Sequence, residues 1–229
     1  MPIPIYTIQD LFITKGTDVK LSIKQFDIHR GACYAFEGRM GSGKTTFLET
    51  LYLRKKISKS KIIFEEKDIY KYSFNDYKKQ IAVVPQNFRV PWGRVRNYML
   101  KTLKSYGHIN NPERRLNDIS KKMKLSPYLD RKIRHLTPGE LRWVVLATMI
   151  SADTKILFID EFELHLSKRE LSTLLSILHK KINYDGITLI TSTLNKDLLS
   201  RIASVTVTLE KGKITSVRSS GKRKKYNKK

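Results

Sequence analysis

The 229-residue chain is 40% hydrophobic and carries 45 lysines and arginines against 21 acidic residues, which gives a formal net charge of +24. That excess predicts a polyanion close by, either nucleic acid or an anionic membrane surface, unless lysine serves only as solvated surface. No apolar run approaches the roughly 18 residues that a membrane-spanning helix needs, the first residues do not form a secretory signal, and the single cysteine, Cys33, excludes an internal disulfide, so we expect a cytosolic protein.

The first half of the chain predicts a strand-rich start that leads into a loop and a helix. Short β-like segments separated by turn residues occupy 3–36, and their alternating apolar residues indicate strands with one buried face. A glycine-rich loop follows, and the apolar spacing after it predicts a helix that begins at Lys44. Apolar runs at 61–64 and 80–86 predict two further strands. This order of strand, loop, helix and strand is typical of a parallel α/β unit.

The second half predicts a helical insertion followed by a return to strands. Charged, helix-forming sequence at about 87–153 indicates an inserted helical subdomain. The elements expected after it are strands at 155–160, 186–191, 204–209 and 213–217 and a helix at 168–181. Strands that alternate with helices predict an α/β fold with a mainly parallel sheet covered on both faces. We expect one domain over 1–217 and a basic, disordered tail at 218–229.

A phosphate-binding loop is predicted at 36–46, which reads FEGRMGSGKTT. Gly38, Gly43, Lys44 and Thr45 satisfy the spacing GxxxxGK[ST], in which glycines let successive backbone N–H groups point at phosphate oxygens. Lys44 is expected to reach the β- and γ-phosphates, and the Thr45 hydroxyl is expected to bind Mg²⁺. The expected nucleotide-binding residues of this loop are Gly38, Gly41, Ser42, Gly43, Lys44, Thr45 and Thr46.

Two further features each allow a functional and a structural interpretation. ILFIDE at 156–161 is an apolar strand that ends in two carboxylates. Beside a phosphate loop, Asp160 is expected to hold Mg²⁺ and Glu161 to orient or deprotonate the attacking water, although two acids at a strand end can also form a helix-capping turn. Near the N-terminus, Tyr6 and Phe12 could stack on an adenine base or pack within the sheet.

Together these motifs resemble the ATP-binding subunit of ABC-type ATPases. VVPQNF at 83–88 is similar to the family's Q-loop, LTPGELR at 136–142 to its signature, and TLITST at 188–193 to its switch-histidine segment. The resemblance implies a P-loop NTPase core with an N-terminal antiparallel β segment and an inserted helical subdomain. It also implies ATP and Mg²⁺ as ligands, with Gln86 in contact with the metal or the catalytic water.

The half of the site that the family presents across a dimer departs from the usual pattern. The resemblance implies that Thr137 and Gly139 of one subunit bind the γ-phosphate held by the other, in a homodimer or a heterodimer. Pro138 stands where a glycine is usual and offers no N–H. Ser192 stands where the switch histidine is expected, and Ser167 where an aspartate is common. We therefore expect ATP binding together with slow hydrolysis.

The leading functional hypothesis is an ABC-type motor subunit that binds Mg-ATP, dimerises and acts on an integral membrane protein from the cytoplasmic face. The segment PQNFRVPWGRVRNYM at 85–99 resembles small FtsE-like and LolD-like subunits, which implies a role in cell division or lipoprotein handling. A nucleotide-dependent scaffold with little hydrolysis stays open as an alternative. A nucleic-acid-associated ABC protein is the third possibility, favoured by the positive charge and the lysine-rich tail. Against it, such proteins generally carry two ATP-binding halves or a long coiled-coil insertion, and the sequence shows neither.

Overall fold

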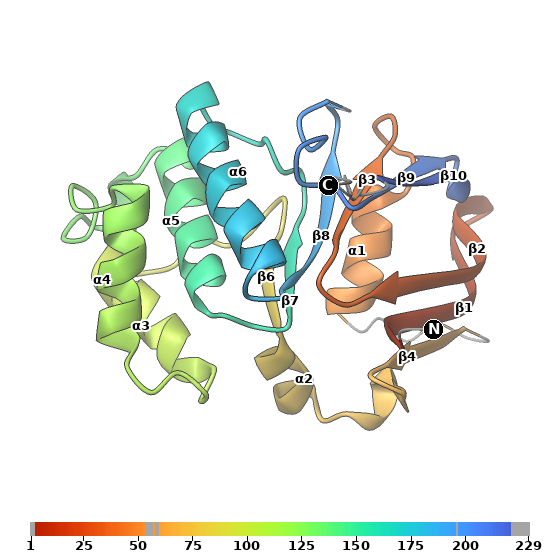
Figure 1. The fold of residues 1–229 in the computed structure, drawn as a ribbon, viewed down its shortest axis with the longest axis horizontal. Helices are drawn as coiled ribbons and strands as arrows, with labels where there is room; N and C mark the ends of the chain where they lie inside the picture. Colours follow the sequence, from red (N-terminus) through yellow and green to blue (C-terminus); the bar gives the residue numbers. More distant parts are fainter. Residues whose placement is uncertain (1–2, 54–56, 58–59, 196, 221–229) are drawn as a thin grey trace, which may run out of the picture.

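Two β-sheets, with a group of helices beside the larger one, make up the protein (Figure 1). The structure is a computed structural model that describes residues 3–53, 57, 60–195 and 197–220. Within this part of the chain, no helix combines the length and the apolar character that crossing a membrane requires. The strands are β1 (Pro4–Lys15), β2 (Asp18–His29), β3 (Cys33–Glu37), β4 (Lys61–Phe64), β5 (Lys67–Asp68), β6 (Ile81–Val84), β7 (Ile156–Ile159), β8 (Thr188–Thr193), β9 (Val205–Glu210) and β10 (Lys213–Ser219). The helices are α1 (Lys44–Tyr52), α2 (Phe74–Gln80), α3 (Val95–Ser105), α4 (Pro112–Met123), α5 (Pro138–Ser151) and α6 (Lys168–Asn183), with short 3₁₀ turns at Ile69–Lys71 and Ile133–His135.

The smaller sheet is antiparallel and has the order β2-β1-β4-β5. Its first two strands form a long hairpin, as the alternating apolar residues and turn residues of this region predict. Tyr6 of β1 is fully buried, and its hydroxyl lies 2.5 Å from the hydroxyl of Tyr77. Tyr6 therefore packs within the fold, whereas Phe12 is 52% exposed.

The larger sheet positions the chemistry-bearing loops. Its order is β10-β9-β3-β8-β7-β6, and every neighbouring pair except β10 with β9 is parallel. The α/β fold with a mainly parallel sheet is thus confirmed. Because the carboxyl ends of parallel strands meet at one edge, the segments that follow β3, β6, β7 and β8 come together there.

The larger sheet is buried on both faces, as β7 illustrates. Leu157 and Ile159 belong to the apolar cluster shared with α3, α4, α5 and α6. Ile156 and Phe158 point the other way, into the cluster shared with β1, β2 and α1. A strand with both faces covered needs an unbroken apolar run, which explains why the sequence ILFI shows no alternation.

The segment predicted as a helical insertion contains α3, α4 and α5. α5 begins with a capping box, in which the Thr137 hydroxyl and the Glu140 carboxylate each satisfy a backbone N–H of the other residue. Further along α5, the Trp143 indole Nε1 donates a 2.9 Å hydrogen bond to the Met123 carbonyl at the end of α4. This contact, together with apolar packing, fixes α4 against α5.

Two local features differ from the sequence expectation. α2 was not predicted, because its seven residues are too few for a clear period, although Ser73 caps it by accepting a hydrogen bond from the Asp76 N–H. The predicted tail begins two residues too early, since Arg218 and Ser219 pair with β9 as the end of β10. An edge strand of this kind tolerates polar side chains. The rest of the predicted tail, 221–229, lies outside the described residues.

Candidate functional site

A sharply curled loop joins β3 to α1. Gly38 has a φ of 149° and Gly43 a φ of 106°, values that other residues rarely adopt. A Cβ atom at Gly38 would lie 2.3 Å from the Leu209 carbonyl oxygen, and one at Gly43 would lie 2.9 Å from that of Lys20. The loop therefore needs glycine at both positions, and it leads directly into the N-terminus of α1, which suits an anion. The residues predicted to bind nucleotide lie on this loop or in the first turn of α1: Gly38, Gly41, Ser42, Gly43, Lys44, Thr45 and Thr46.

The Lys44 ammonium lies over its own loop. Its Nζ donates hydrogen bonds to the Gly38 carbonyl at 2.7 Å and to the Arg39 carbonyl at 3.1 Å. Burial lowers the pKa of Lys44, while the nearby carboxylates of Glu161 and Asp160 oppose that shift. The structure thus places the Lys44 ammonium close enough to the carboxylates of Asp160 and Glu161 for their charges to interact. A bound phosphate could replace the two loop carbonyls as the hydrogen-bond partner of Lys44.

One carboxylate oxygen of Asp160 has no hydrogen-bond partner among the described residues. The side chain is 1% exposed, and Oδ1 accepts a 2.5 Å hydrogen bond from the Ser192 hydroxyl. Oδ2 is buried with no partner among the described residues, and the same holds for the Ser42 hydroxyl of the phosphate loop. Hard oxygen donors of this kind suit Mg²⁺, which keeps several waters and phosphate oxygens in its shell. The described residues hold no group of three or more His, Cys, Asp or Glu side chains that could bind a metal.

The backbone of Glu161 is held from both sides. This residue has a φ of 49°, and its N–H donates a 2.7 Å hydrogen bond to the Ser192 hydroxyl. Its carbonyl accepts a 3.0 Å hydrogen bond from the Arg142 guanidinium. These hydrogen bonds hold the backbone of Glu161 without using its carboxylate. The carboxylate could therefore act on a ligand or a water molecule.

Arg142 is a site residue that the sequence analysis missed. It is 1% exposed, and besides Glu161 its guanidinium donates to the Asp160 carbonyl at 2.6 Å and to the Pro85 carbonyl at 2.6 Å. Burial lowers its pKa to about 10, although nearby carboxylates oppose the shift. A lone arginine in the otherwise apolar stretch of α5 was the signal in the sequence, because a buried charge must find partners.

Gln86 directly follows Pro85, whose carbonyl accepts a hydrogen bond from Arg142. It is partly buried in the segment that leaves β6, and the Asp160 N–H donates a 2.9 Å hydrogen bond to the Val84 carbonyl at the end of that strand. This pairing of β6 with β7 places the Gln86 backbone near Asp160, at the carboxyl-terminal edge of the larger sheet. No hydrogen bond of its side chain appears among the described residues, so its expected metal contact stays a prediction.

Thr137 and Gly139 lie at the start of α5, among the helices on the other side of the larger sheet from α1 (Figure 1). The Thr137 N–H donates a 2.8 Å hydrogen bond to the Glu140 carboxylate. That bond, with help from the Arg131 guanidinium 2.8 Å away, lowers the pKa of Glu140 and keeps it ionised. Pro138 occupies the first helical position, where a missing N–H costs the helix nothing but leaves one donor fewer for a ligand.

Ser192, which the resemblance aligns with the switch histidine, lies within β8. Ser192 is fully buried inside β8, which continues to Thr193, so the first residue beyond the strand is the half-exposed Leu194. Ser192 therefore supports Asp160 and Glu161 and does not face a ligand at the strand end. The end of β8 is held by Glu163, a residue that the sequence analysis did not single out; its carboxylate accepts from the Leu194 N–H at 2.8 Å and from the Thr193 hydroxyl at 3.0 Å.

Replacing Ser192 by alanine is expected to lower the free energy of unfolding by about 1–3 kcal/mol, because the Asp160 carboxylate and the Glu161 N–H each lose a buried partner. Urea unfolding of Ser192→Ala measures the loss. Thr215→Ala on the exposed strand β10 is the matched control and is expected to change little, since its own 3.4 Å hydrogen bond is long. An unchanged urea midpoint for Ser192→Ala would remove this support role. Ser192→His would overpack the same buried position and is expected to destabilise the fold further.

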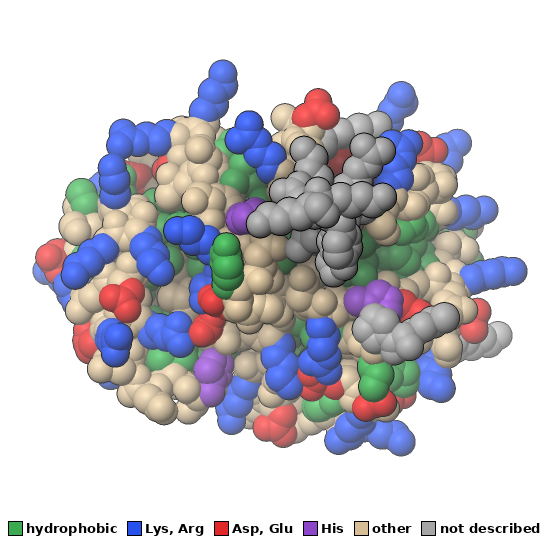
Figure 2. Space-filling model, in the orientation of Figure 1, with side chains coloured by type: hydrophobic (Ala, Val, Ile, Leu, Met, Phe, Trp, Pro, Cys, Tyr) green, Lys and Arg blue, Asp and Glu red, His purple; other side chains and the backbone are tan. Residues whose placement is uncertain are grey.

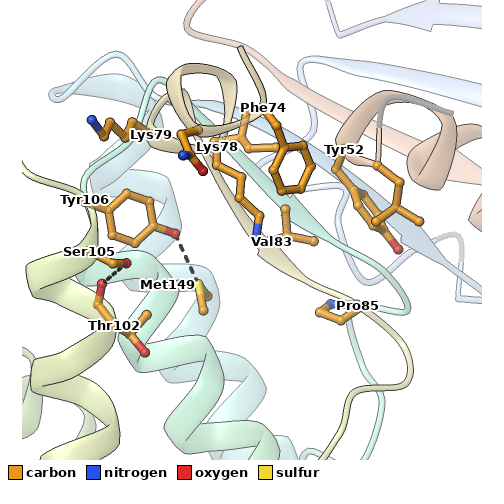
Figure 3. A pocket seen from close by; sticks show the side chains of 13 residues that line it. Tyr52, Phe74, Lys78, Lys79, Val83, Pro85, Thr102, Ser105, Tyr106 and Met149 are labelled. Atoms are coloured by element: carbon orange, nitrogen blue, oxygen red, sulfur yellow. Dashed lines mark hydrogen bonds between the residues drawn. The ribbon is translucent and has the colours of Figure 1, made fainter. Parts of the chain in front are cut away.

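An apolar groove of about 770 Å³ lies beside this site, between α2 and the end of α1 on one side and α3 and α5 on the other. Figure 3 shows Phe74, Val83, Tyr106 and Met149 around it, with the Tyr106 hydroxyl 3.6 Å from the Met149 sulfur. Pro85, whose carbonyl Arg142 holds, also lines the groove. The groove and the carboxylates are therefore joined through a single buried side chain.

Comparison with known proteins gives a consistent result. The family model described as "ABC transporter" matches residues 21–163. The iron(3+)-hydroxamate import ATP-binding protein FhuC of Bacillus subtilis is 23% identical to this chain, over 90% of this chain and 79% of its own length. Several other curated ABC ATP-binding proteins are longer, and the chain spans 27% to 66% of their length. The structure of CbiO1 from Clostridium perfringens, part of the complex CbiONQ, has a TM-score of 0.78 at 20% identity, covering 94% of this chain and 88% of that one. A dimeric ATP-binding cassette, MJ0796, bound to ADP and Pi, has a TM-score of 0.81 at 18% identity, covering 93% and 98%.

Proposed function

The chain belongs to the ABC transporter family of ATP-binding proteins, and from this premise we propose that it is the ATP-binding subunit of a membrane complex. It binds Mg-ATP at the loop between β3 and α1, pairs with a second ATP-binding subunit, and passes the closure of that pair to an integral membrane protein. The chain acts as a peripheral subunit on the cytoplasmic face of the membrane. FhuC and CbiO1, which are named for import and for a multi-subunit complex, support a role of this kind.

The observation that carries the proposal is the path from the groove to the carboxylates. Pro85 lines the groove, and its carbonyl accepts a 2.6 Å hydrogen bond from Arg142. The same guanidinium holds the backbone of Asp160 and Glu161. A partner helix that fills the groove would displace or fix Pro85, and the buried guanidinium would transmit that change to the carboxylates.

Each residue of the nucleotide site has a role that its position supports. Lys44 would bind the β- and γ-phosphates, and Thr45 and the unpartnered Oδ2 of Asp160 would hold Mg²⁺. A metal held there would neutralise negative charge on the phosphates. Glu161 orients or deprotonates the attacking water from a fixed backbone, and Gln86 senses the metal shell from the segment that lines the groove.

The half-site that would face the partner subunit's nucleotide is weaker than is usual in this family. Pro138 lacks an N–H, and the Thr137 N–H is already bonded to the ionised Glu140 carboxylate. Leu194, not a histidine, follows β8. A γ-phosphate that approached Gly139 and Thr137 would meet fewer free donors, so we propose slow hydrolysis in a homodimer and faster hydrolysis where a different partner subunit supplies an intact half-site.

Two narrower readings compete within this proposal. The FtsE-like reading, with a role in cell division, draws on 85–99, the segment that leads from the groove to α3. A nucleotide-dependent scaffold with little hydrolysis is favoured by the weak half-site. On the face drawn in Figure 2, lysine and arginine side chains are scattered among acidic ones. Nucleic-acid binding is the third possibility, which the net charge of +24 supports.

Replacing Phe74 by glutamate is expected to reduce the increase in ATP turnover caused by the membrane partner at least tenfold. The change removes the aromatic ring that an apolar helix face would pack on and puts a carboxylate within reach of Lys78 in its place. The measurement is phosphate release by the chain with and without the copurified partner in lipid nanodiscs. Tyr184→Glu, at an 81% exposed position outside the groove, is the matched control. If both variants respond to the partner as the wild type does, the groove is not the coupling surface. A Lys44→Ala preparation, which lacks the phosphate-loop ammonium, defines the nucleotide-free baseline.

A further inference from the structure

A projecting apolar tip follows Gln86, and neither the nucleotide site nor the groove uses it. The Trp92 side chain is 92% exposed, and Val90, two residues before it, is 51% exposed. Trp92 is one of two tryptophans in the chain, and the other, Trp143, is buried with its Nε1 bonded to the Met123 carbonyl. An indole this exposed contributes little to the core and is accessible to a partner outside the fold.

The base of this tip is rigid. The Ile133 N–H donates a 2.9 Å hydrogen bond to the Gly93 carbonyl, and Arg94 forms an antiparallel bridge with Lys132. At the residue after Arg94, the Val95 N–H donates a 3.1 Å hydrogen bond to the Arg131 carbonyl. Trp92 is thus presented from a fixed platform, which lowers the entropy lost when it meets a partner.

Cations surround the tip without acidic partners. Arg94, Lys132 and Arg134 line a hollow of about 300 Å³ beside Trp92. Within the described ranges, no acidic side chain forms an ion pair with these three residues, whereas the neighbouring Arg131 is paired with Glu140. The Arg94 guanidinium donates to the Asp130 carbonyl and Arg134 Nε to the His135 ring, so no carboxylate of the described residues neutralises either charge. A cluster of cations without ion pairs is complementary to phosphate, and the tip beside it is apolar.

We infer that this surface, Val90 to Arg94 with Lys132 and Arg134, binds the anionic face of a lipid bilayer. An indole at the level of the headgroups and basic side chains on lipid phosphates are the two contacts by which peripheral proteins hold an anionic membrane. An acidic peptide could meet the same cations, but it would leave most of the 92% exposed indole uncovered, whereas a bilayer interface covers it. A single-stranded nucleic acid would need successive aromatic platforms, and Val90 cannot stack on a base. The inference rests on the proposed function in one respect only, that the chain works beside a membrane.

The test uses the full chain and vesicles of phosphatidylcholine with or without phosphatidylserine, in the absence of nucleotide and membrane partner. The expected result is a blue shift of tryptophan emission with the anionic vesicles only, which reports Trp92 because Trp143 is already buried. Lys132→Gln with Arg134→Gln is expected to weaken binding about 25-fold, at roughly fivefold for each charge, and Trp92→Ala to weaken it while abolishing the shift. Lys121→Gln with Lys122→Gln, two exposed residues of α4, removes the same charge elsewhere and is the matched control.

Three outcomes would overturn the inference. Equal weakening by the two double variants would assign the binding to overall charge. A blue shift with oligo(dT) or with polyglutamate, but not with anionic vesicles, would assign the surface to nucleic acid or to an acidic protein segment. No shift with any of them would leave the tip without this role. Because no membrane partner is present, failure here leaves the groove prediction intact, and failure of the groove prediction does not affect this assay.

Discussion

Replacing Glu161 by glutamine is expected to lower ATP turnover by about 100-fold or more while Mg-ATP affinity stays close to that of the wild type. Glutamine has the same shape, and the backbone at 161 is held by Ser192 and Arg142 through atoms that the change does not touch. Only the carboxylate that would orient or deprotonate water is lost. With turnover blocked, the ATP-bound dimer should accumulate, because dissociation would otherwise follow hydrolysis.

Phosphate release, fluorescent-nucleotide affinity and the dimer fraction by light scattering together measure this effect. Glu163→Gln is the matched control, since it removes a nearby carboxylate that is occupied with the end of β8. We expect that control to retain most of its turnover and to lose some stability. Robust turnover in Glu161→Gln would exclude Glu161 as the group that acts on water, and loss of nucleotide binding would show that its role is structural.

Replacing Arg142 by methionine is expected to lower the free energy of unfolding by about 3 kcal/mol. The side chains are similar in length, but the carbonyls of Pro85, Asp160 and Glu161 would lose a charged donor inside the fold. Removing a buried charge recovers part of its desolvation cost, which keeps the estimate below the sum of three hydrogen bonds. Urea unfolding measures the loss.

Arg142 is also expected to be needed for coupling, which separates its role from stability alone. At a temperature where Arg142→Met is still folded, partner-stimulated turnover should fall more than turnover of the isolated chain, because Pro85 is no longer tied to Asp160. Arg142→Lys, which keeps the charge without the fork of donors, should recover part of the stability and little of the coupling. Arg114→Met, at an 80% exposed side chain, is the control for loss of a positive charge. Equal loss of both rates in Arg142→Met would reduce its role to a structural one.

The sequence prediction went wrong or fell short where contacts join distant parts of the chain. The motif aligned Ser192 with the switch position but did not predict its contacts: the register of β8 on β7, with Thr191 opposite Ile159, brings its hydroxyl beside Asp160. Arg142 and Glu163 were not recognised, because their partners lie in other segments that only the strand order brings near. No local pattern contains that information.

The sequence by itself determined the elements whose physics is local. Only glycine readily adopts the positive φ of Gly38 and Gly43, so the glycine loop could be recognised from its spacing. An unbroken apolar run was enough to place the buried strand that ends directly before Asp160. The tertiary structure alone decided how Asp160 is supported, how the groove is connected to it through Arg142, and which surface is left bare around Trp92. The reason is that hydrogen-bond partners and burial depend on which strands lie side by side, and the pairing of β3 with β8 alone joins residues more than 100 positions apart.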